Sequence, residues 1–160
     1  MKIYGQLTIL FTGLLFGLWG IRRGESYLSL IEELQLALSI IENEISFALK
    51  PLPVAFTQAA KVTKQTKIFF LEAVERAQNG EACLFNLDLL PLKNEERKVL
   101  NELGLRLGRG TDQEQTALIL RALARLEESR KKNQEKLIKV TPLWRWLSPL
   151  TALLVVLLTC

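Results

Sequence analysis

Two long stretches without ionisable side chains, one near each end of the chain, constrain the fold more than any other feature. Residues 3–21 (IYGQLTILFTGLLFGLWGI) carry no charge, and a helix of this length just crosses the hydrocarbon layer of ~30 Å. A cleaved signal peptide is the alternative, but the apolar run is long, lacks a small-x-small cleavage pattern and is followed directly by Arg22 and Arg23. We therefore predict a transmembrane anchor over residues 1–21.

The second charge-free stretch, residues 147–160 (LSPLTALLVVLLTC), is short for a complete span. Trp144 and Trp146 precede it, and tryptophan is typical of the membrane interface. Arg145 can extend its charged end from between them to the lipid headgroups. We predict a C-terminal membrane segment over residues 143–160, which either spans the bilayer or inserts deeply.

The distribution of charge predicts the side of the membrane on which the middle of the chain lies. The chain has 21 basic and 17 acidic residues, and all of them except Lys2 lie from Arg22 to Arg145. Because basic residues favour the cytoplasmic side, we expect a cytoplasmic domain over residues 22–142. The protein is then at a cell membrane, with both termini on the far side of the bilayer.

The composition argues against catalysis. The chain has no histidine, which removes the commonest general base and the usual zinc ligand. Cys83 and Cys160 are too few and too far apart for a disulfide framework or a metal site. The acidic pairs Glu32-Glu33 and Glu95-Glu96 point in different directions on a helix, so we expect solvated surface there. We predict no enzyme, no catalytic or metal-binding residue and no cofactor.

The cytoplasmic segment has the apolar spacing of helices throughout. In residues 26–50, apolar side chains recur at steps of three and four, which is typical of a helix packed against others. Leu30, Ala37, Ile40 and Phe47 widen this stripe beyond a coiled-coil seam, so we expect a bundle helix. The seam consists of Tyr27, Ile31, Leu34, Leu38, Ile41, Ile45 and Ala48.

Two short helices are predicted next. A turn at Lys50-Pro51-Leu52-Pro53 ends the first helix, and a helix from Pro53 carries inward-facing apolar residues. A second helix, in residues 67–80 (KIFFLEAVERAQNG), ends at Gly80. Residues 81–93 are apolar with a proline and predict one or two turns of helix. The inward-facing residues are Val54, Phe56 and Ala59 in the first of these helices, and Phe70, Leu71, Val74 and Ala77 in the second.

A helical hairpin follows. Asn94 is a predicted N-cap, and Gly104 and Gly108 leave room for another helix to cross closely. Thr111 and Glu114 have the spacing of a capping box that starts the last helix. The inner faces are Val99, Leu100, Leu103 and Leu107 in one helix, and Leu118, Ile119, Ala122 and Leu126 in the other. The predicted fold class is all-α: an antiparallel helical bundle flanked by N-terminal and C-terminal transmembrane helices.

Several short motifs in this order resemble the stage III sporulation protein AB family of endospore-forming bacteria. The resemblance covers nearly the whole chain, although Thr111 stands where the family usually has an aspartate. The turn should survive, because threonine also caps helices. The motifs are Glu44-Ile45, Pro51-Leu52-Pro53-x-Ala55-Phe56, Phe69-Phe70, Gly80, Leu103-Gly104-x-x-Leu107-Gly108, Gln115 and Leu126-Glu127.

The resemblance implies a fold similar to the cytoplasmic domain of the platform protein of type II secretion and type IV pilus machines. It also implies a place in the channel between mother cell and forespore, in the mother-cell membrane around the forespore. The expected partners are a secretion-type ATPase similar to stage III sporulation protein AA, and other membrane proteins of the same complex. The protein would be a scaffold that docks the ATPase, and a bundle without a phosphate-binding loop is compatible with that.

Two surface turns are the candidate contact sites of such a scaffold, because loops carry function more often than core helices. They are the turn at Lys50 to Pro53 and the turn at Arg109-Gly110. The alternative function is an oligomeric membrane-pore subunit with the bundle as gate. In that case Gly13, Gly17 and Gly20 would form a close-packing face, and a homo-oligomer is possible.

The basic residues of the last helix have four alternative explanations. Acidic residues interleave with them, which favours a solvated helix face over a site for anionic lipid of the bilayer or for a protein partner. Nucleic acid is not an expected partner, because no aromatic and basic residues combine into a binding platform. The residues concerned are Arg130, Lys131, Lys132, Lys136 and Lys139, with Glu127, Glu128 and Glu135 among them.

Overall fold

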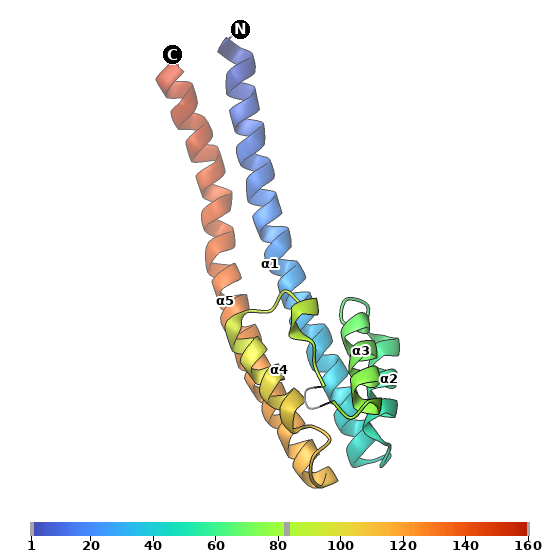
Figure 1. The fold of residues 1–160 in the computed structure, drawn as a ribbon. Helices are drawn as coiled ribbons and strands as arrows, with labels where there is room; N and C mark the ends of the chain where they lie inside the picture. Colours follow the sequence, from blue (N-terminus) through green and yellow to red (C-terminus); the bar gives the residue numbers. More distant parts are fainter. Residues whose placement is uncertain (1, 82–83, 160) are drawn as a thin grey trace. The chain divides into compact units, whose positions relative to one another are not determined.

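The computed structural model describes the backbone of residues 2–81 and 84–159, and the side chains of residues 24–81, 84–136 and 138. Every regular element in this part of the chain is a helix, so the all-α prediction is confirmed there (Figure 1). The helices are α1 (Lys2–Ser46), α2 (Leu52–Val62), α3 (Lys67–Gln78), the 3-10 helix η1 (Leu87–Leu89), α4 (Asn94–Arg106) and α5 (Asp112–Thr159).

The chain divides into two compact units. One combines Met1–Leu28 with Lys132–Cys160, and the other is Ser29–Lys131, which we call the helical unit. Among the described residues, no helix combines the length and the hydropathy that a membrane span requires. Within the predicted membrane segments 1–21 and 143–160, residues 2–21 and 143–159 have helical backbone, but the side chains of both segments lie outside the described residues. Both segments therefore stay predictions.

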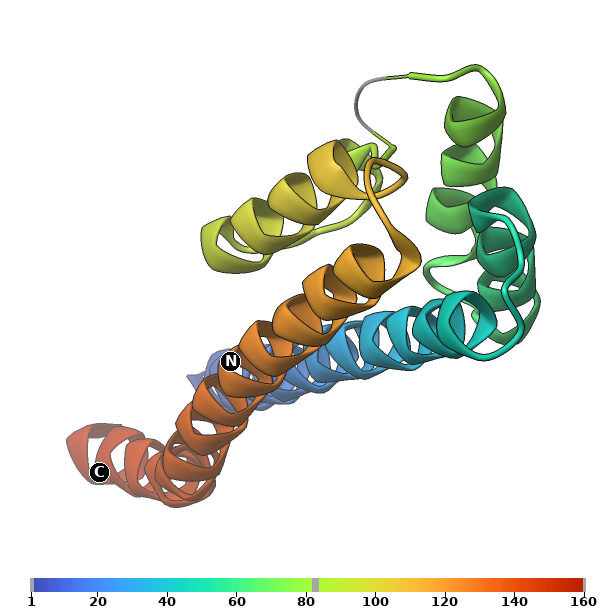
Figure 2. The same ribbon diagram turned by 90° about the horizontal axis from the view of Figure 1, so that it is seen from below.

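The helical unit contains two antiparallel hairpins. The first is α2 with α3, and the second is α4 with α5, where Arg125 of α5 lies 3.2 Å from Glu102 of α4. Seen from below, α3 and α4 lie on separate flanks of the unit (Figure 2). The α1 seam is confirmed from Ile31 to Ile45, whereas Phe47 and Ala48 at its end are exposed, because α1 ends at Ser46 and the chain leaves the core.

Four phenylalanines form the centre of the core around the first hairpin. Phe56 of α2 and Phe69 and Phe70 of α3 meet Phe85, with ring centroids 5.0 to 6.4 Å apart. The rings bury a large apolar area and also gain from their tilted and edge-on geometry. Two inward assignments were wrong: Val54 is 39% and Leu71 is 46% exposed. The periodicity predicted both helices correctly, but it included in each buried face one residue that in fact faces solvent.

The connection between the hairpins is mostly extended, with η1 as its one short helix in the described residues. It enters the core through Leu84 and Phe85, and the Leu84 backbone N–H donates to the Gly104 carbonyl. A Cβ on Gly104 would lie 3.0 Å from the Phe85 ring. Gly104 therefore leaves room for this ring, and the predicted close crossing by another helix was wrong at Gly104.

Helix boundaries follow local chemistry. Gly80 has a φ of +69°, as expected for a left-handed stop after α3. The capping box is confirmed, since the Thr111 N–H donates to the Glu114 carboxylate and the Glu114 N–H donates to the Thr111 hydroxyl. Asn94 is not the N-cap of α4, because the helix starts one residue earlier than predicted and Lys93 precedes it.

Candidate interaction surface

The two turns predicted as alternative contact sites lie at the same end of the helical unit. A Cβ on Gly108 would be 3.4 Å from the Leu52 side chain, so the α4–α5 turn packs against the start of α2. We call residues 47–51 and 107–111 together the end turns (Figure 1). The sequence suggested each turn singly, but only the packing of Gly108 on Leu52 joins them into one surface.

The first end turn presents two large apolar side chains to solvent. Phe47 is 81% and Leu49 is 72% exposed. Leu49 has a φ of +49°, a left-handed conformation that costs a residue other than glycine roughly 1–2 kcal/mol. The Lys50 N–H donates to the Glu44 carbonyl, and the Lys50 Nζ lies 2.6 Å from the Glu44 carboxylate. The turn is thus held in a strained shape that exposes hydrophobic surface.

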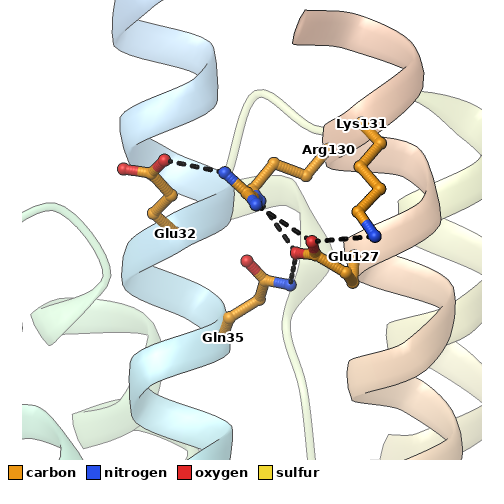
Figure 3. Close-up of polar contacts among 5 residues, drawn as sticks. All are labelled: Glu32, Gln35, Glu127, Arg130 and Lys131. Carbon is orange, nitrogen blue, oxygen red and sulfur yellow. Dashed lines mark hydrogen bonds and ion pairs between the residues drawn. The ribbon is translucent and has the colours of Figure 1, made fainter.

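A charged network joins α1 to α5 at the other end of the helical unit (Figure 3). Arg130 binds both carboxylate oxygens of Glu127 at 2.8 and 2.9 Å and reaches Glu32 of α1 at 3.3 Å. The Gln35 amide of α1 also donates to Glu127, at 3.1 Å. Lys131 adds a longer contact of 3.7 Å to the same carboxylate. This network sets the register of the two antiparallel helices.

The network keeps Glu127 charged. The hydrogen bonds from Arg130, and then from Gln35, lower the pKa of Glu127 from 4.5 to about 2. The same Glu127 carboxylate raises the pKa of the Arg130 guanidinium. Arg130, whose side chain is 26% exposed, is therefore committed to the fold, which corrects the prediction of a solvated face for this residue, whereas Lys131 is exposed as predicted. Lys132 and Lys136 are exposed, and the Lys139 side chain lies outside the described residues.

Both acidic pairs contain one structural residue, so the prediction of solvated surface was wrong for half of each pair. The Glu33 carboxylate accepts from the N–H of Lys64 and from the N–H and hydroxyl of Thr66, and so fixes the α2–α3 connection to α1. Glu96 is 1% exposed, whereas its neighbour Glu95 is exposed. Adjacent residues on a helix point about 100° apart, so one of them can face the core.

Glu96 is held by one residue of α5. The Ser129 hydroxyl donates to Glu96 Oε1, while Glu96 Oε2 has no hydrogen-bond partner among the described residues. A buried carboxylate that loses its partner retains the full cost of desolvation. The pair therefore fixes the first turn of α4 on α5 by a polar contact in an otherwise apolar core.

Ser129→Ala should lower the free energy of unfolding by about 1–3 kcal/mol, because it leaves Glu96 buried without that hydrogen bond. Chemical denaturation followed by circular dichroism measures the change. Ser29→Ala is the matched control. Ser29 is exposed, and its hydroxyl accepts a long hydrogen bond of 3.3 Å from the exposed Gln65 side chain. Equal stability of the two variants would show that the Glu96 contact is not stabilising.

No catalytic constellation is evident in the part of the chain described. No group of three or more acidic, histidine or cysteine side chains there could hold a metal ion. The absence of enzymatic activity stays a prediction, and Gly13, Gly17 and Gly20 lie outside the described side chains.

The described features define a class: an all-α protein with exposed apolar end turns and a polar clamp between its first and last helices. A family model described as stage III sporulation protein AB matches residues 2–160. The chain therefore belongs to this family, as its motifs predicted, and has a role in sporulation. Searches of the curated proteins and of the solved structures give no match. The likeness to the platform protein of secretion machines stays a prediction.

Proposed function

We propose that this chain is a non-enzymatic membrane platform of the channel between mother cell and forespore. Residues 1–21 and 143–160 anchor it in the mother-cell membrane, and the helical unit lies in the cytoplasm. There it docks a secretion-type ATPase to the membrane proteins of the same complex. Family membership supports the place in sporulation, and the two charge-free ends support the anchoring.

The exposed end turns carry the docking role. Phe47 and Leu49 are held in solvent by a strained turn, and strain of this kind persists where surrounding structure enforces it, often at functional sites. Large apolar side chains that enter a partner's pocket supply most of the binding energy of many interfaces. The partner should therefore offer an apolar pocket to this pair of side chains.

The test is co-purification of the full-length protein with the secretion-type ATPase from sporulating cells. Phe47→Ala combined with Leu49→Ala should reduce the recovered ATPase at least about tenfold, as for the loss of an interface anchor. Val62→Ala is the matched control, because Val62 is 56% exposed outside the end turns. Equal recovery with all proteins would reject the end turns as the contact. Failure of the wild-type protein to recover ATPase would reject the docking role.

A further inference from the structure

Two grooves of opposite charge lie on different flanks of the helical unit. The first, which we call the acidic groove, follows the outer face of α3. Ile68 is 70% and Leu71 is 46% exposed at one end of it. Glu72 accepts hydrogen bonds from Asn86 at 2.9 Å and from Arg76 at 2.8 Å, and these bonds, that from Asn86 first, lower its pKa and keep it charged. The lining residues are Ile68, Leu71, Glu72, Glu75, Arg76, Asn79 and Glu81.

The second, which we call the basic groove, lies between α4 and α5. Arg121 and Arg125 line it together with apolar side chains, and Glu102 supplies the acidic charge, paired with Arg125 at 3.2 Å. The lining residues are Val99, Glu102, Leu103, Leu118, Arg121, Ala122 and Arg125.

One charged residue in each groove has no ion pair with any described residue. Glu75 is exposed in the acidic groove, and Arg121 is exposed in the basic groove. Each groove thus combines aliphatic surface with a charge that a neighbour of opposite sign could pair. Such complementary patches favour one partner and one orientation.

The two unpaired charges lie at the same level along the helices. Gln35 of α1 contacts Glu127 of α5, and Glu33 of α1 contacts Thr66, just before α3. Glu75 is nine residues beyond Thr66 on a helix that runs in the same direction as α1, so it lies about 13 Å further along at ~1.5 Å per residue. Gln35 lies two residues beyond Glu33 on α1, so Glu127 lies about 3 Å beyond the level of Thr66. The remaining distance of about 10 Å corresponds to about seven residues, and counting these back from Glu127 along the antiparallel α5 reaches residues 120–121.

We propose that a second copy of this chain occupies each groove. The acidic groove of one copy pairs with the basic groove of the next, with Glu75 opposite Arg121 and the aliphatic side chains between them. This arrangement rests on the proposed anchoring, which orients all copies alike in one membrane and so keeps the two levels matched. The contact is head-to-tail, and repetition gives a ring if the rotation closes or an open array if it does not.

Disulfide cross-linking of the full-length protein in membranes tests this contact. The background is Cys83→Ser with Cys160→Ser, and the reporters are Gln78→Cys in one copy and Ala117→Cys in another. Both reporters are exposed and lie on the same side of the Glu75–Arg121 pair, so that pair stays intact. Co-expressed copies should cross-link with each other on mild oxidation.

Asn43→Cys replaces Gln78→Cys in the control, because Asn43 is exposed on α1 at the level of Glu75. It should give little product with Ala117→Cys. Equal yields from both combinations, or cross-linking only between two Gln78→Cys copies, would overturn the head-to-tail contact. No product from either combination would overturn it as well.

Exchanging the charges of Glu75 and Arg121 is a second test of the same contact. Glu75→Arg or Arg121→Glu alone should reduce the cross-linked fraction at least about fivefold, and both together should restore it. Unchanged circular dichroism shows that the variants fold. If the single variants reduce the cross-linked fraction and the double variant does not restore it, the pairing of Glu75 with Arg121 is overturned. ATPase co-purification through Phe47 and Leu49 is measured separately, so failure here is distinct from failure of the docking role.

Discussion

Phe70→Ala should be the most destabilising single truncation in the helical unit, with a loss of about 3–5 kcal/mol in the free energy of unfolding. Phe70 is fully buried and contacts the rings of Phe56, Phe69 and Phe85. Its removal loses apolar burial and leaves a cavity between α2, α3 and the connection that carries Phe85. Other rings cannot fill the space, because each is fixed by its own helix or loop.

Chemical denaturation of the full-length protein in detergent, followed by circular dichroism, measures this loss. Leu71→Ala is the matched control, since Leu71 is the next residue of the same helix and is 46% exposed. It should cost less than about 1 kcal/mol, as is usual for surface positions. A similar loss for both variants would contradict the assignment of Phe70 to the core.

Arg130→Glu should destabilise the protein most at neutral pH and less as the pH is lowered into the acid range. In the wild-type protein, the folded state holds the pKa of Glu127 at about 2, against an ordinary value of 4.5. The resulting stabilisation is fully present above pH 4.5 and is lost as the pH falls from there towards 2. In the variant, the new carboxylate faces Glu32 and Glu127, so like charges repel and protonation relieves the repulsion.

Thermal melts between neutral pH and pH 3 distinguish the two behaviours. The melting temperature of the wild-type protein should fall as the pH is lowered, whereas the deficit of Arg130→Glu relative to wild type should shrink. Added salt should also reduce that deficit at neutral pH, because it screens the repulsion. Lys136→Glu, an exposed position further along the same helix, is the control. A constant deficit across pH and salt would contradict an electrostatic clamp.

The predictions that succeeded used patterns that act locally. The α1 seam, the stop at Gly80 and the capping box of Thr111 and Glu114 depend on neighbours within one or two helical turns. The predictions that failed concerned faces and partners. Leu71 and Phe47 are apolar at helical spacing yet exposed, since the packing partner of each face comes from elsewhere in the chain.

The candidate surfaces show the same division. Sequence reasoning selected the two turns, because proline and glycine mark turns directly. It could not show that they lie side by side, which follows from the packing of Gly108 on Leu52. It also missed both grooves, since their residues come from outward faces that look like ordinary amphipathic helix surface.

The sequence by itself determined the helical class, the stop of α3 at Gly80, the capping box that starts α5 and the family, because hydrophobic periodicity, capping residues and motif spacing are properties of short stretches of chain. Only the tertiary structure decided that Glu96 is buried against Ser129, that Arg130 joins α1 to α5, and that the end turns form one surface. Each of these depends on contacts between residues far apart in the chain. The geometry of such contacts is set when the whole core packs, and no local pattern encodes it.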